Sequence, residues 1–247
     1  MMKRHFNSIL ILGAGSSVAE ALAYRYAAEG CSLILAARNV ERLDRIARDI
    51  RLRNEVDVLL KEFDSLDYDS HQLFVDSLPW IPDIVIVTFG YLGNQELALT
   101  DFKEARKIIE TNYLGAVSIM NALAQKMKGR NGILVGIASV AGLRGRMSNF
   151  TYGSAKAGFL NYLSGLRNWG YHNGIHVVSI IPGFMQTPMI AHMKTPKFLT
   201  LSPDRAAHLI FRAIQKKRNI AYIGPIWCWI MFIIRLIPEY IFKKLRL

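Results

Sequence analysis

The sequence predicts an α/β fold: a doubly wound, parallel sheet of about seven strands with helices on both faces. Short apolar runs alternate with segments of helical periodicity along the 247 residues, and such alternation implies parallel strands joined by crossover helices. The length suits one large α/β domain and is short for two. Residues of chemical interest follow the predicted strands, where sites in open parallel sheets form. These are Gly13, Arg38, Asp64, Gly90, Ser139 and Pro182.

Each predicted strand is a short apolar run bounded by turn residues. We expect strands at 9–12, 32–36, 56–62, 84–87, 132–139, 176–181 and 220–223. Helices are expected from the turn at 13–19 to about 29, over the charged stretch after 39, from about 101 to 128, from 149 onward and at 203–217. We expect one domain over 1–225 that includes a mobile flap rich in Pro, Met and Phe at about 183–202, followed by an apolar, basic tail at 226–247.

Positive charge is concentrated near the C-terminus. The net charge is +12, and beyond residue 193 eleven Lys or Arg side chains stand against only Asp204 and Glu239. Such a patch could serve nucleic acid, an anionic membrane or a phosphorylated substrate. Because Trp and Phe are interleaved with the basic residues, the pattern favours a membrane surface over nucleic acid. The uncharged run at 220–234 is shorter than the roughly 20 residues of a spanning helix. The alternative is a last strand and a helix that packs on the domain or at a dimer interface.

Cysteine and histidine usage indicates a reducing compartment and no metal site. Cys31 and Cys228 lie far apart without metal-type spacing. His172 and His176 are four residues apart, but Asn173-Gly174 between them is typical of a helix end. The first apolar run is too short for a signal peptide, so we interpret it as a strand. We therefore expect a cytoplasmic protein, with peripheral attachment to the inner face of the cytoplasmic membrane if the tail binds lipid.

Ser139, Tyr152 and Lys156 form the candidate catalytic group. Tyr152 and Lys156 are four residues apart in a helical segment, so their side chains share one face. A phenol beside an ammonium is a candidate acid, because the positive charge is expected to lower the pKa of the tyrosine. Ser139 ends the preceding strand and could hold a substrate oxygen. Tyr240 and Lys244 have the same spacing, but no serine at a strand end precedes them.

The turn after the first strand predicts a nucleotide phosphate site. Backbone N–H groups of such a turn and of the helix start can hold a pyrophosphate. The usual later glycines are replaced by Ser17 and Ala19, so an ordinary tight strand–helix turn is the alternative. Arg38 favours NADP, because an arginine accommodates the 2′-phosphate whereas NAD sites usually carry an acidic residue there. The alternative for Arg38 is a solvated arginine that opens the next helix.

Three further positions complete the predicted site. Asp64 could accept a hydrogen bond from an adenine amino group, or cap the next helix. Gly90 after the fourth strand would let the backbone approach a nucleotide. Asn112 lies within an apolar helical pattern and needs a partner. Structural bracing and a catalytic role in holding water are equally compatible with that pattern.

In their order and spacing, these residues resemble the short-chain dehydrogenase/reductase family over nearly the whole chain. The resemblance rests on 13–19, Asp64, Asn112, Ser139, Tyr152, Lys156, Pro182, Gly183 and Thr187. It implies a Rossmann-type fold and an NAD(P)(H) oxidoreductase. It also implies that Asn112, Ser139, Tyr152 and Lys156 form a catalytic tetrad. The cofactor-binding residues carried over are Gly13, Gly15, Ser16, Ser17, Val18, Arg38, Asp64, Ser65, Phe89, Gly90, Tyr152, Lys156, Pro182, Gly183 and Thr187.

A narrower set of segments resembles the decaprenylphosphoryl-2-ketoribose reductases. The segments are 63–71, 89–93, 148–153, 235–238 and 241–245. Members of that group reduce a polyprenyl-phosphate-linked 2-keto-pentose to the arabinose epimer, after a flavin-dependent oxidase has begun the epimerisation. Thr88-Phe89-Gly90 departs from the broad family's Asn-Ala-Gly and agrees with this group. Arg38 is less typical of the group, whose usual preference is NADH.

The resemblance implies a hydrophobic or lipid-linked keto substrate and a flavin-dependent oxidase as partner. We also expect a homo-oligomer, and Arg38 favours NADP(H) over NAD(H) as the cofactor. A rival within enzymes is a reductase of another hydrophobic ketone, such as a steroid, fatty acyl or quinone substrate. A catalytically silent nucleotide-binding sensor or scaffold is disfavoured, because such proteins typically lose the tyrosine or the lysine. A nucleic-acid-binding module rests on net charge alone.

Overall fold

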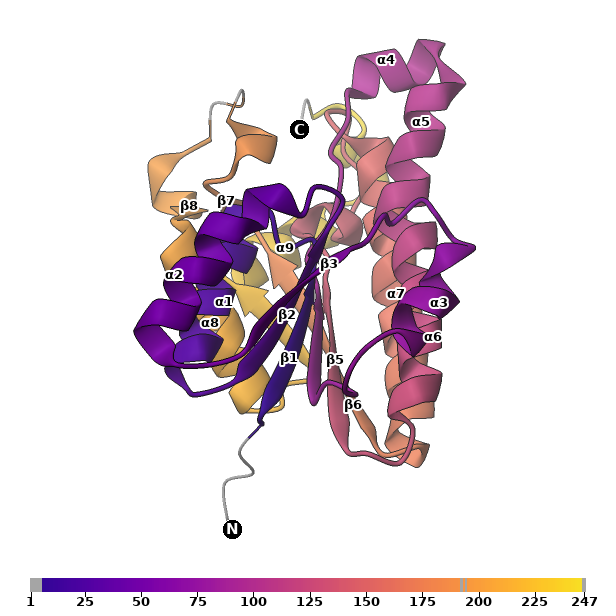
Figure 1. The fold of residues 1–247 in the computed structure, drawn as a ribbon. Helices are drawn as coiled ribbons and strands as arrows, with labels where there is room; N and C mark the ends of the chain where they lie inside the picture. The colour runs from indigo at the N-terminus through magenta and orange to yellow at the C-terminus, as the bar shows by residue number, and fades with distance from the viewer. Residues whose placement is uncertain (1–5, 192, 194, 246–247) are drawn as a thin grey trace.

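A seven-stranded parallel sheet forms the centre of the molecule (Figure 1). The computed structural model describes residues 6–191, 193 and 195–245. The strand order is β3-β2-β1-β4-β5-β6-β9, and every neighbouring pair is parallel. The strands are β1 (Ser8–Leu12), β2 (Ser32–Ala37), β3 (Val58–Glu62), β4 (Ile84–Val87), β5 (Gly132–Ile137), β6 (Ile175–Pro182) and β9 (Ile220–Ile223). The predicted Rossmann-type fold is confirmed. From β1 the chain adds β2 and β3 on one side, and then adds β4 and the later strands on the other side of β1.

Helices cover both faces, as Figure 1 shows. One layer contains α1 (Ser17–Ala28), α2 (Asp44–Asn54) and α8 (Pro203–Gln215). The other contains α3 (Ser70–Asp76), α6 (Gly115–Met127) and α7 (Phe150–His172). Strand β1 shows why the sheet is sandwiched: Ile9 and Ile11 enter the first core, whereas Leu10 and Leu12 enter the second. A strand buried on both faces is apolar throughout, and this explains the continuous apolar runs of the sequence.

Short elements at the carboxyl edge of the sheet carry the loops of the site. They are α4 (Gln95–Thr100), α5 (Phe102–Ile109), the 3-10 turns η1 (Glu41–Leu43), η3 (Val140–Leu143), η4 (Pro188–Ile190) and η5 (Lys197–Leu199), and the paired strands β7 (Phe184–Met185) and β8 (Thr200–Leu201). The sequence predicted none of these as separate elements. Residues of α5 fall within the helix expected from about 101 to 128, whereas the other elements are too short to leave a periodic pattern.

The helix expected from about 101 to 128 is not continuous, so that prediction is corrected. A π-helical turn, η2 (Glu110–Leu114), separates α5 from α6. Asn112 lies in this turn, and its Nδ2 donates to the carbonyl of Ile108 at 2.8 Å. Gly115 follows where a Cβ would lie 2.2 Å from the carbonyl oxygen of Ser65. Single π turns are frequent at functional sites, and this one directs Asn112 toward the end of β4.

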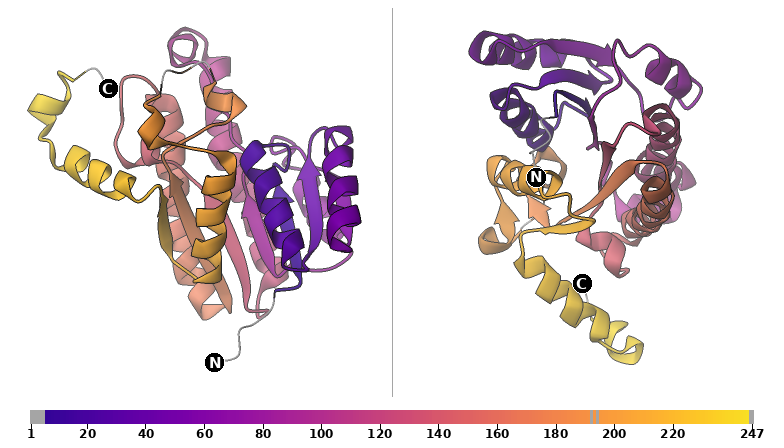
Figure 2. Two further views of the ribbon diagram at one scale, coloured as in Figure 1. Left: turned by 90° about the vertical axis from the view of Figure 1, so that its left-hand side faces the viewer. Right: turned by 90° about the horizontal axis from the view of Figure 1, so that it is seen from below.

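The tail forms α9 (Ile226–Leu236) and α10 (Glu239–Phe242), which extend from the edge of the body (Figure 2). Trp227 and Met231 of α9 pack against Val140 and Ile181 in a third apolar cluster. The inner face of the tail therefore packs on the domain. In the part of the chain that the structure describes, no helix is long and apolar enough to cross a membrane.

Candidate active site

A cleft of about 830 Å³ lies along the carboxyl edge of the sheet. The segments that line it follow β1, β2, β4, β5 and β6, so strands far apart in the sequence converge there. Most of the sequence-predicted site residues line this cleft. Those that do are Gly13, Gly15, Ser16, Val18, Arg38, Ser65, Phe89, Gly90, Ser139, Tyr152, Lys156, Pro182, Gly183 and Thr187. Ser17, Asp64 and Asn112 are not among the lining residues.

The turn between β1 and α1 is shaped for close backbone approach. Gly13 has φ of 84°, and a Cβ there would lie 2.6 Å from the amide nitrogen of Phe89, so a side chain is excluded by both conformation and space. A Cβ on Gly15 would meet no protein atom within 4 Å, which leaves room beside the backbone for a ligand. Ser16 caps α1 by accepting a hydrogen bond from Ala19 N at 3.2 Å. These features fit a dinucleotide pyrophosphate at the helix N-terminus.

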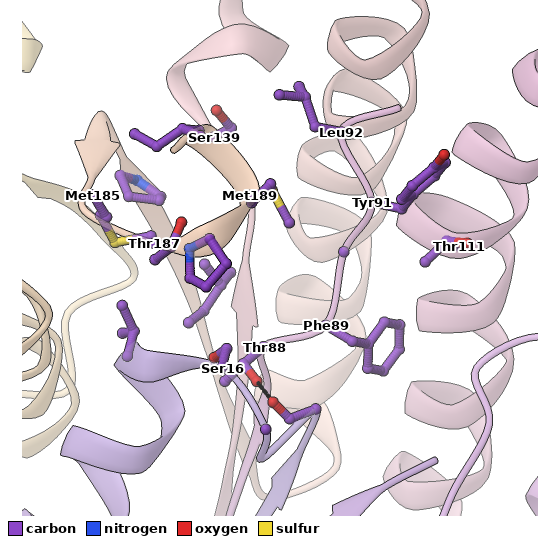
Figure 3. A pocket seen from close by; sticks show the side chains of 18 of the residues that line it. Ser16, Thr88, Phe89, Tyr91, Leu92, Thr111, Ser139, Met185, Thr187 and Met189 are labelled. Carbon is purple, nitrogen blue, oxygen red and sulfur yellow. Dashed lines mark hydrogen bonds between the residues drawn. The ribbon is translucent and has the colours of Figure 1, made fainter. Parts of the chain in front are cut away.

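Thr88 ties the end of β4 to this turn. Its Oγ1 lies 2.8 Å from the carbonyl oxygen of Leu12 and 2.9 Å from that of Gly13, and it can donate its proton to either. Figure 3 marks a hydrogen bond at Thr88 with a dashed line. The threonine thus holds two neighbouring strand ends together beneath the cleft. Sequence reasoning noted Thr88 only as a departure from the broad family pattern, and the hydroxyl gives that departure a structural role.

Asn112 has its amide group occupied by backbone partners. The side chain is 1% exposed. Its Oδ1 accepts from Tyr91 N at 3.2 Å, and its Nδ2 donates to Tyr91 O and Ile108 O. A Cβ on Gly90 would lie 2.9 Å from that Oδ1 and 3.5 Å from Lys156 Nζ. Of the two expectations for Asn112, these contacts describe bracing, while a role in holding water stays a prediction.

Ser139, Tyr152 and Lys156 all line the cleft. We call the part of the cleft between these three residues and the segment at 183–202 its substrate end. Ser139 follows β5 and accepts from Ala141 N at 3.1 Å. Tyr152 lies in the first turn of α7, and Lys156 lies one turn later with its Nζ 5.7 Å from the Tyr152 ring centroid. Lys156 is 3% exposed, and its Nζ donates to the carbonyl of Ile137 at 3.2 Å. A strand end and one helix face therefore bring a hydroxyl, a phenol and an ammonium together.

The expected lowering of the tyrosine pKa is wrong for this structure. Burial raises the pKa of Tyr152 to about 12, and a hydrogen bond with Ser139 opposes the rise. Burial also lowers the pKa of Lys156 to about 8. The reason is that desolvation disfavours the charged form of both groups. The Lys156 ammonium donates a hydrogen bond to the Ile137 carbonyl, and it does not outweigh the effect of burial on the pKa of Tyr152.

We call the part of the cleft beside the β1–α1 turn and Arg38 its nucleotide end, and it carries more positive charge than the sequence suggested. Arg42 and Arg45 line the cleft with Arg38, whereas the sequence indicated only a charged helical stretch after residue 39. Arg42 lies in the 3-10 turn η1 and Arg45 at the start of α2. Their spacing of three along the chain is the signal that could have placed them on one face. Arg45 also pairs with Glu20 at 3.5 Å.

Asp64 turns away from the cleft in the structure. Its Oδ1 accepts from Leu66 N at 3.0 Å within a turn, and Ser65 and Leu66 line the cleft in its place. The expected contact of Asp64 with an adenine amino group therefore stays a prediction. The buried His71 holds the same turn, because its ring nitrogens contact the Asp64 carbonyl and Ser118 Oγ at 2.9 Å each.

The segment at 183–202 covers the substrate end with apolar side chains. Figure 3 shows Met185, Thr187 and Met189 across the cleft from Tyr91 and Leu92. The β7–β8 pair closes the base of this segment, so the predicted flap is tied at both ends; within the flap, residues 192 and 194 lie outside the described residues. Charged lining residues that the sequence did not assign to the site include Arg42, Arg45, Lys107 and Arg146.

Trp227 connects the tail to this cover. A Cβ on Gly183 would lie 1.8 Å from Trp227 Nε1. The indole also meets the Phe184 ring edge-on at 5.2 Å between centroids, and its Nε1 donates to Leu199 O at 3.4 Å.

No group of three or more His, Cys, Asp or Glu side chains that could hold a metal ion occurs among the described residues.

Comparison with known proteins shows the family. Residues 7–197 match the short chain dehydrogenase family model. The chain is 35% identical to an uncharacterized oxidoreductase of Mycobacterium tuberculosis, over 96% of each chain. It is 29% identical to an 11-beta-hydroxysteroid dehydrogenase-like protein of Arabidopsis thaliana, over 94% of this chain and 78% of the relative.

A solved structure supports the fold. A short-chain dehydrogenase from Sphingobium yanoikuyae, in complex with NADPH, superposes with a TM-score of 0.80 at 21% identity, over 94% of this chain and 97% of that one. The glycine turn, the hydroxyl–phenol–ammonium group and the family match agree with one another. The chain therefore belongs to the short-chain dehydrogenase family and is an NAD(P)-dependent oxidoreductase.

Proposed function

We propose that this enzyme reduces a ketone to a secondary alcohol, and that its substrate is the 2-keto group of a polyprenyl-phosphate-linked pentose. The reaction would be the second step of a ribose-to-arabinose epimerisation. The observation that carries the reductase assignment is the convergence of Ser139, Tyr152 and Lys156 at one end of a dinucleotide-sized cleft. The substrate assignment is supported by the resemblance of 63–71, 89–93 and 148–153 to that group of reductases.

Tyr152 supplies the proton in this proposal. The nicotinamide cofactor supplies a hydride to the ketone carbon when it is bound. With a pKa of about 12, the phenol is fully protonated at neutral pH and can donate to the oxygen on which negative charge develops. Ser139 donates a hydrogen bond to the same oxygen, where it stabilises the developing charge. Lys156, when protonated, stabilises the phenolate that the transfer leaves behind.

The apolar cover supports a large hydrophobic substrate. Met185 and Met189 line the substrate end, and thioether side chains adapt to irregular apolar surfaces. A second reading is favoured by the steroid dehydrogenase-like relative: reduction of another hydrophobic ketone, such as a steroid, fatty acyl or quinone compound. In both proposals Tyr152 donates the proton. They differ only in which ketone fits beneath the apolar segment at 183–202.

The direct test follows the oxidation of NADPH and of NADH at the nicotinamide absorbance with a polyprenyl-phosphoryl 2-keto-pentose. We expect turnover in the native protein and a loss of roughly 10²-fold or more in Tyr152→Phe, which keeps the ring and removes the proton donor. Tyr240→Phe, in the tail, is the matched control. Near-native activity of Tyr152→Phe would refute the acid assignment. Turnover of steroid, fatty acyl or quinone ketones instead of the sugar would select the second reading.

NADP(H) is the proposed cofactor. Arg38, Arg42 and Arg45 all line the nucleotide end, and guanidinium groups suit a 2′-phosphate. We expect Arg38→Ala to reduce kcat/KM for NADPH roughly tenfold or more while leaving NADH within about twofold, because one charge-assisted contact is lost. Equal loss with both cofactors would argue against this contact.

We further propose that the outer face of α9 and α10 contacts an anionic membrane from the cytoplasmic side. Trp229, Phe232 and Ile233 are 70%, 57% and 62% exposed. Arg235, Lys243 and Lys244 accompany them, and the carboxylate of Glu239 is paired with Arg144 at 2.9 Å. An exposed apolar face beside basic residues suits an interface with anionic lipid headgroups. The same face would bring a lipid-linked substrate near the cover.

Vesicle sedimentation tests the membrane proposal. We expect binding to phosphatidylglycerol vesicles, weaker binding to phosphatidylcholine, and loss in the combined variant Trp229→Ser, Phe232→Ser and Ile233→Ser. Leu73→Ser with Phe102→Ser removes exposed apolar side chains elsewhere and is the control. If the tail variant binds vesicles normally but changes the oligomeric state, the face is instead an interface between copies. A homo-oligomer and a flavin-dependent oxidase partner remain predictions.

A further inference from the structure

Arg146 carries a guanidinium group that has no role in the proposed mechanism. It lies on the loop between η3 and α7, and it lines the cleft. Its Nε is shielded from solvent and has no hydrogen-bond partner among the residues that the structure describes. Burial lowers the pKa of this guanidinium, yet an arginine remains charged at neutral pH. A shielded guanidinium N–H without a partner is unfavourable, so packing alone does not account for the position of this side chain.

Arg144, two residues earlier, shows how a structural arginine on the same loop differs. Its Nη1 donates to the carbonyls of Ile234 at 2.7 Å and Ile237 at 2.6 Å. Its Nη2 pairs with Glu239, and the guanidinium lies 3.8 Å from the Phe242 ring centroid. Arg144 thus fastens the tail to the loop. Arg146 makes no such contacts in the described part of the chain, and it lines the cleft.

The charges around the substrate end are complementary to an anion. Lys107 also lines the cleft, with its Nζ 4.6 Å from the centroid of the Tyr91 ring. Glu20 is the one acidic residue among the described lining residues. It belongs to α1 at the nucleotide end and pairs with Arg45. No carboxylate among the described lining residues therefore neutralises the cations at the substrate end.

We propose that Arg146, assisted by Lys107, forms a subsite for an oxyanion of the ketone substrate, and that this oxyanion is a phosphate ester. A guanidinium presents a planar fork of N–H donors that matches phosphate oxygens. It is also more weakly hydrated than an ammonium, so its transfer out of water costs less free energy. The inference rests on the proposed function, because it assigns residues to the phosphate group of that substrate. It makes the substrate end selective for phosphorylated over neutral ketones.

Binding of a soluble analogue pair tests the subsite without turnover. Farnesyl phosphate and farnesol differ only in the phosphate, and calorimetric titration into the NADPH-saturated protein compares them. We expect farnesyl phosphate to bind roughly tenfold or more tightly in the native protein, as one charge-assisted contact provides. Arg146→Gln is expected to reduce this preference to about threefold or less, while NADPH affinity stays within about twofold. Arg146→Lys, which keeps the charge and loses the fork, should recover part of the preference.

Two further variants separate the subsite from a structural effect. Arg205→Gln removes an exposed arginine of α8 that does not line the cleft, and we expect no change in either ligand. Lys107→Gln changes an exposed side chain and should fold normally; we expect a smaller loss of preference than in Arg146→Gln. Equal weakening of both ligands in Arg146→Gln, or an undiminished preference for the phosphate, would overturn the inference.

Kinetics with the keto-pentose distinguish this inference from the proposed function. We expect Arg146→Gln to raise KM for the phosphate-linked substrate roughly tenfold or more and to leave kcat within about threefold, because the contact exists before and during the reaction. Turnover with an unchanged KM in the variant would remove the subsite and leave the function. An Arg146-dependent preference for farnesyl phosphate, without turnover of the keto-pentose, would support the subsite and remove the function.

Discussion

The two ends of the cleft are built in different ways. The nucleotide end has a turn made of backbone at the ends of β1 and β4, held by Thr88 and by the Ser16 cap, with arginine side chains beside it. The substrate end is made of side chains on the 139–149 loop and on the 183–202 cover, which the tail supports through Trp227. Backbone geometry at strand ends follows from the fold, whereas loop side chains can vary without changing the sheet. The backbone turn is therefore expected to be the less variable part of the cleft, whereas the loop side chains at the substrate end are expected to decide the substrate.

The largest effect is expected from Gly13→Ala, which should disrupt the nucleotide end. Its φ of 84° and the 2.6 Å approach of a Cβ to Phe89 N leave no room for a methyl group. We expect NADPH affinity to fall roughly 10²-fold or more with a clear loss of thermal stability, because the methyl clashes with backbone. Gly15→Ala is the matched variant and should keep the stability while weakening NADPH, measured by fluorescence titration and thermal melting. Native behaviour of Gly13→Ala would contradict this account.

Trp227→Ala should affect the substrate end and spare the nucleotide end. The indole is 4% exposed and contacts Gly183, Phe184 and Leu199. We expect a loss of about 3 kcal/mol in the free energy of unfolding, as for other buried aromatic side chains. The KM for the ketone should rise while the Kd of NADPH stays within about twofold. Trp229→Ala, whose exposed indole lies on the opposite face of α9, is the control in urea unfolding and kinetics.

The free energy of unfolding should depend on pH through the buried Lys156 at the substrate end. Burial lowers the pKa of Lys156 to about 8 from 10.5, so between these values the unfolded chain binds more protons than the folded chain, and stability rises with pH. Tyr152, with a folded pKa of about 12 against 10.0, acts oppositely only above pH 10. The unfolding free energy of native protein relative to Lys156→Met should therefore increase by roughly 2 kcal/mol from pH 7.5 to 9.5.

The control for that experiment is Lys216→Met, because Lys216 is exposed on the surface. Its difference from the native protein should not change with pH. Urea unfolding at the two pH values measures both variants. A flat difference for Lys156→Met would mean that the ammonium is better solvated than its 3% exposure indicates.

The smallest effect is expected from Arg45→Gln. Arg45 is exposed and already pairs with Glu20 at 3.5 Å, so its contribution to a 2′-phosphate should be screened by solvent. We expect the preference for NADPH over NADH to fall about threefold or less, against a larger change in Arg38→Ala. A greater effect of Arg45→Gln than of Arg38→Ala would reverse the proposed order of contacts. Ratios of kcat/KM for the two cofactors provide the measurement.

The sequence by itself determined the sheet and the positions of its strand ends. Apolar runs such as 84–87 are continuous because β4 is buried on both faces, and small residues at 13–16 mark the turn at which backbone must approach a ligand. The pairing of Tyr152 and Lys156 was equally readable, because four residues along a helix return to the same face. These features depend on local periodicity and on the general topology of parallel sheets.

The tertiary structure alone decided what surrounds those positions. It turned Arg42, Arg45 and Arg146 toward the cleft, directed Asp64 away from it, and interrupted the helix at Asn112. It also reversed the expected pKa change of Tyr152, because desolvation depends on every atom packed around the phenol. Spacing along the chain records which residues share an element. It does not record which distant segments enclose a side chain, and burial and charge pairing depend on that enclosure.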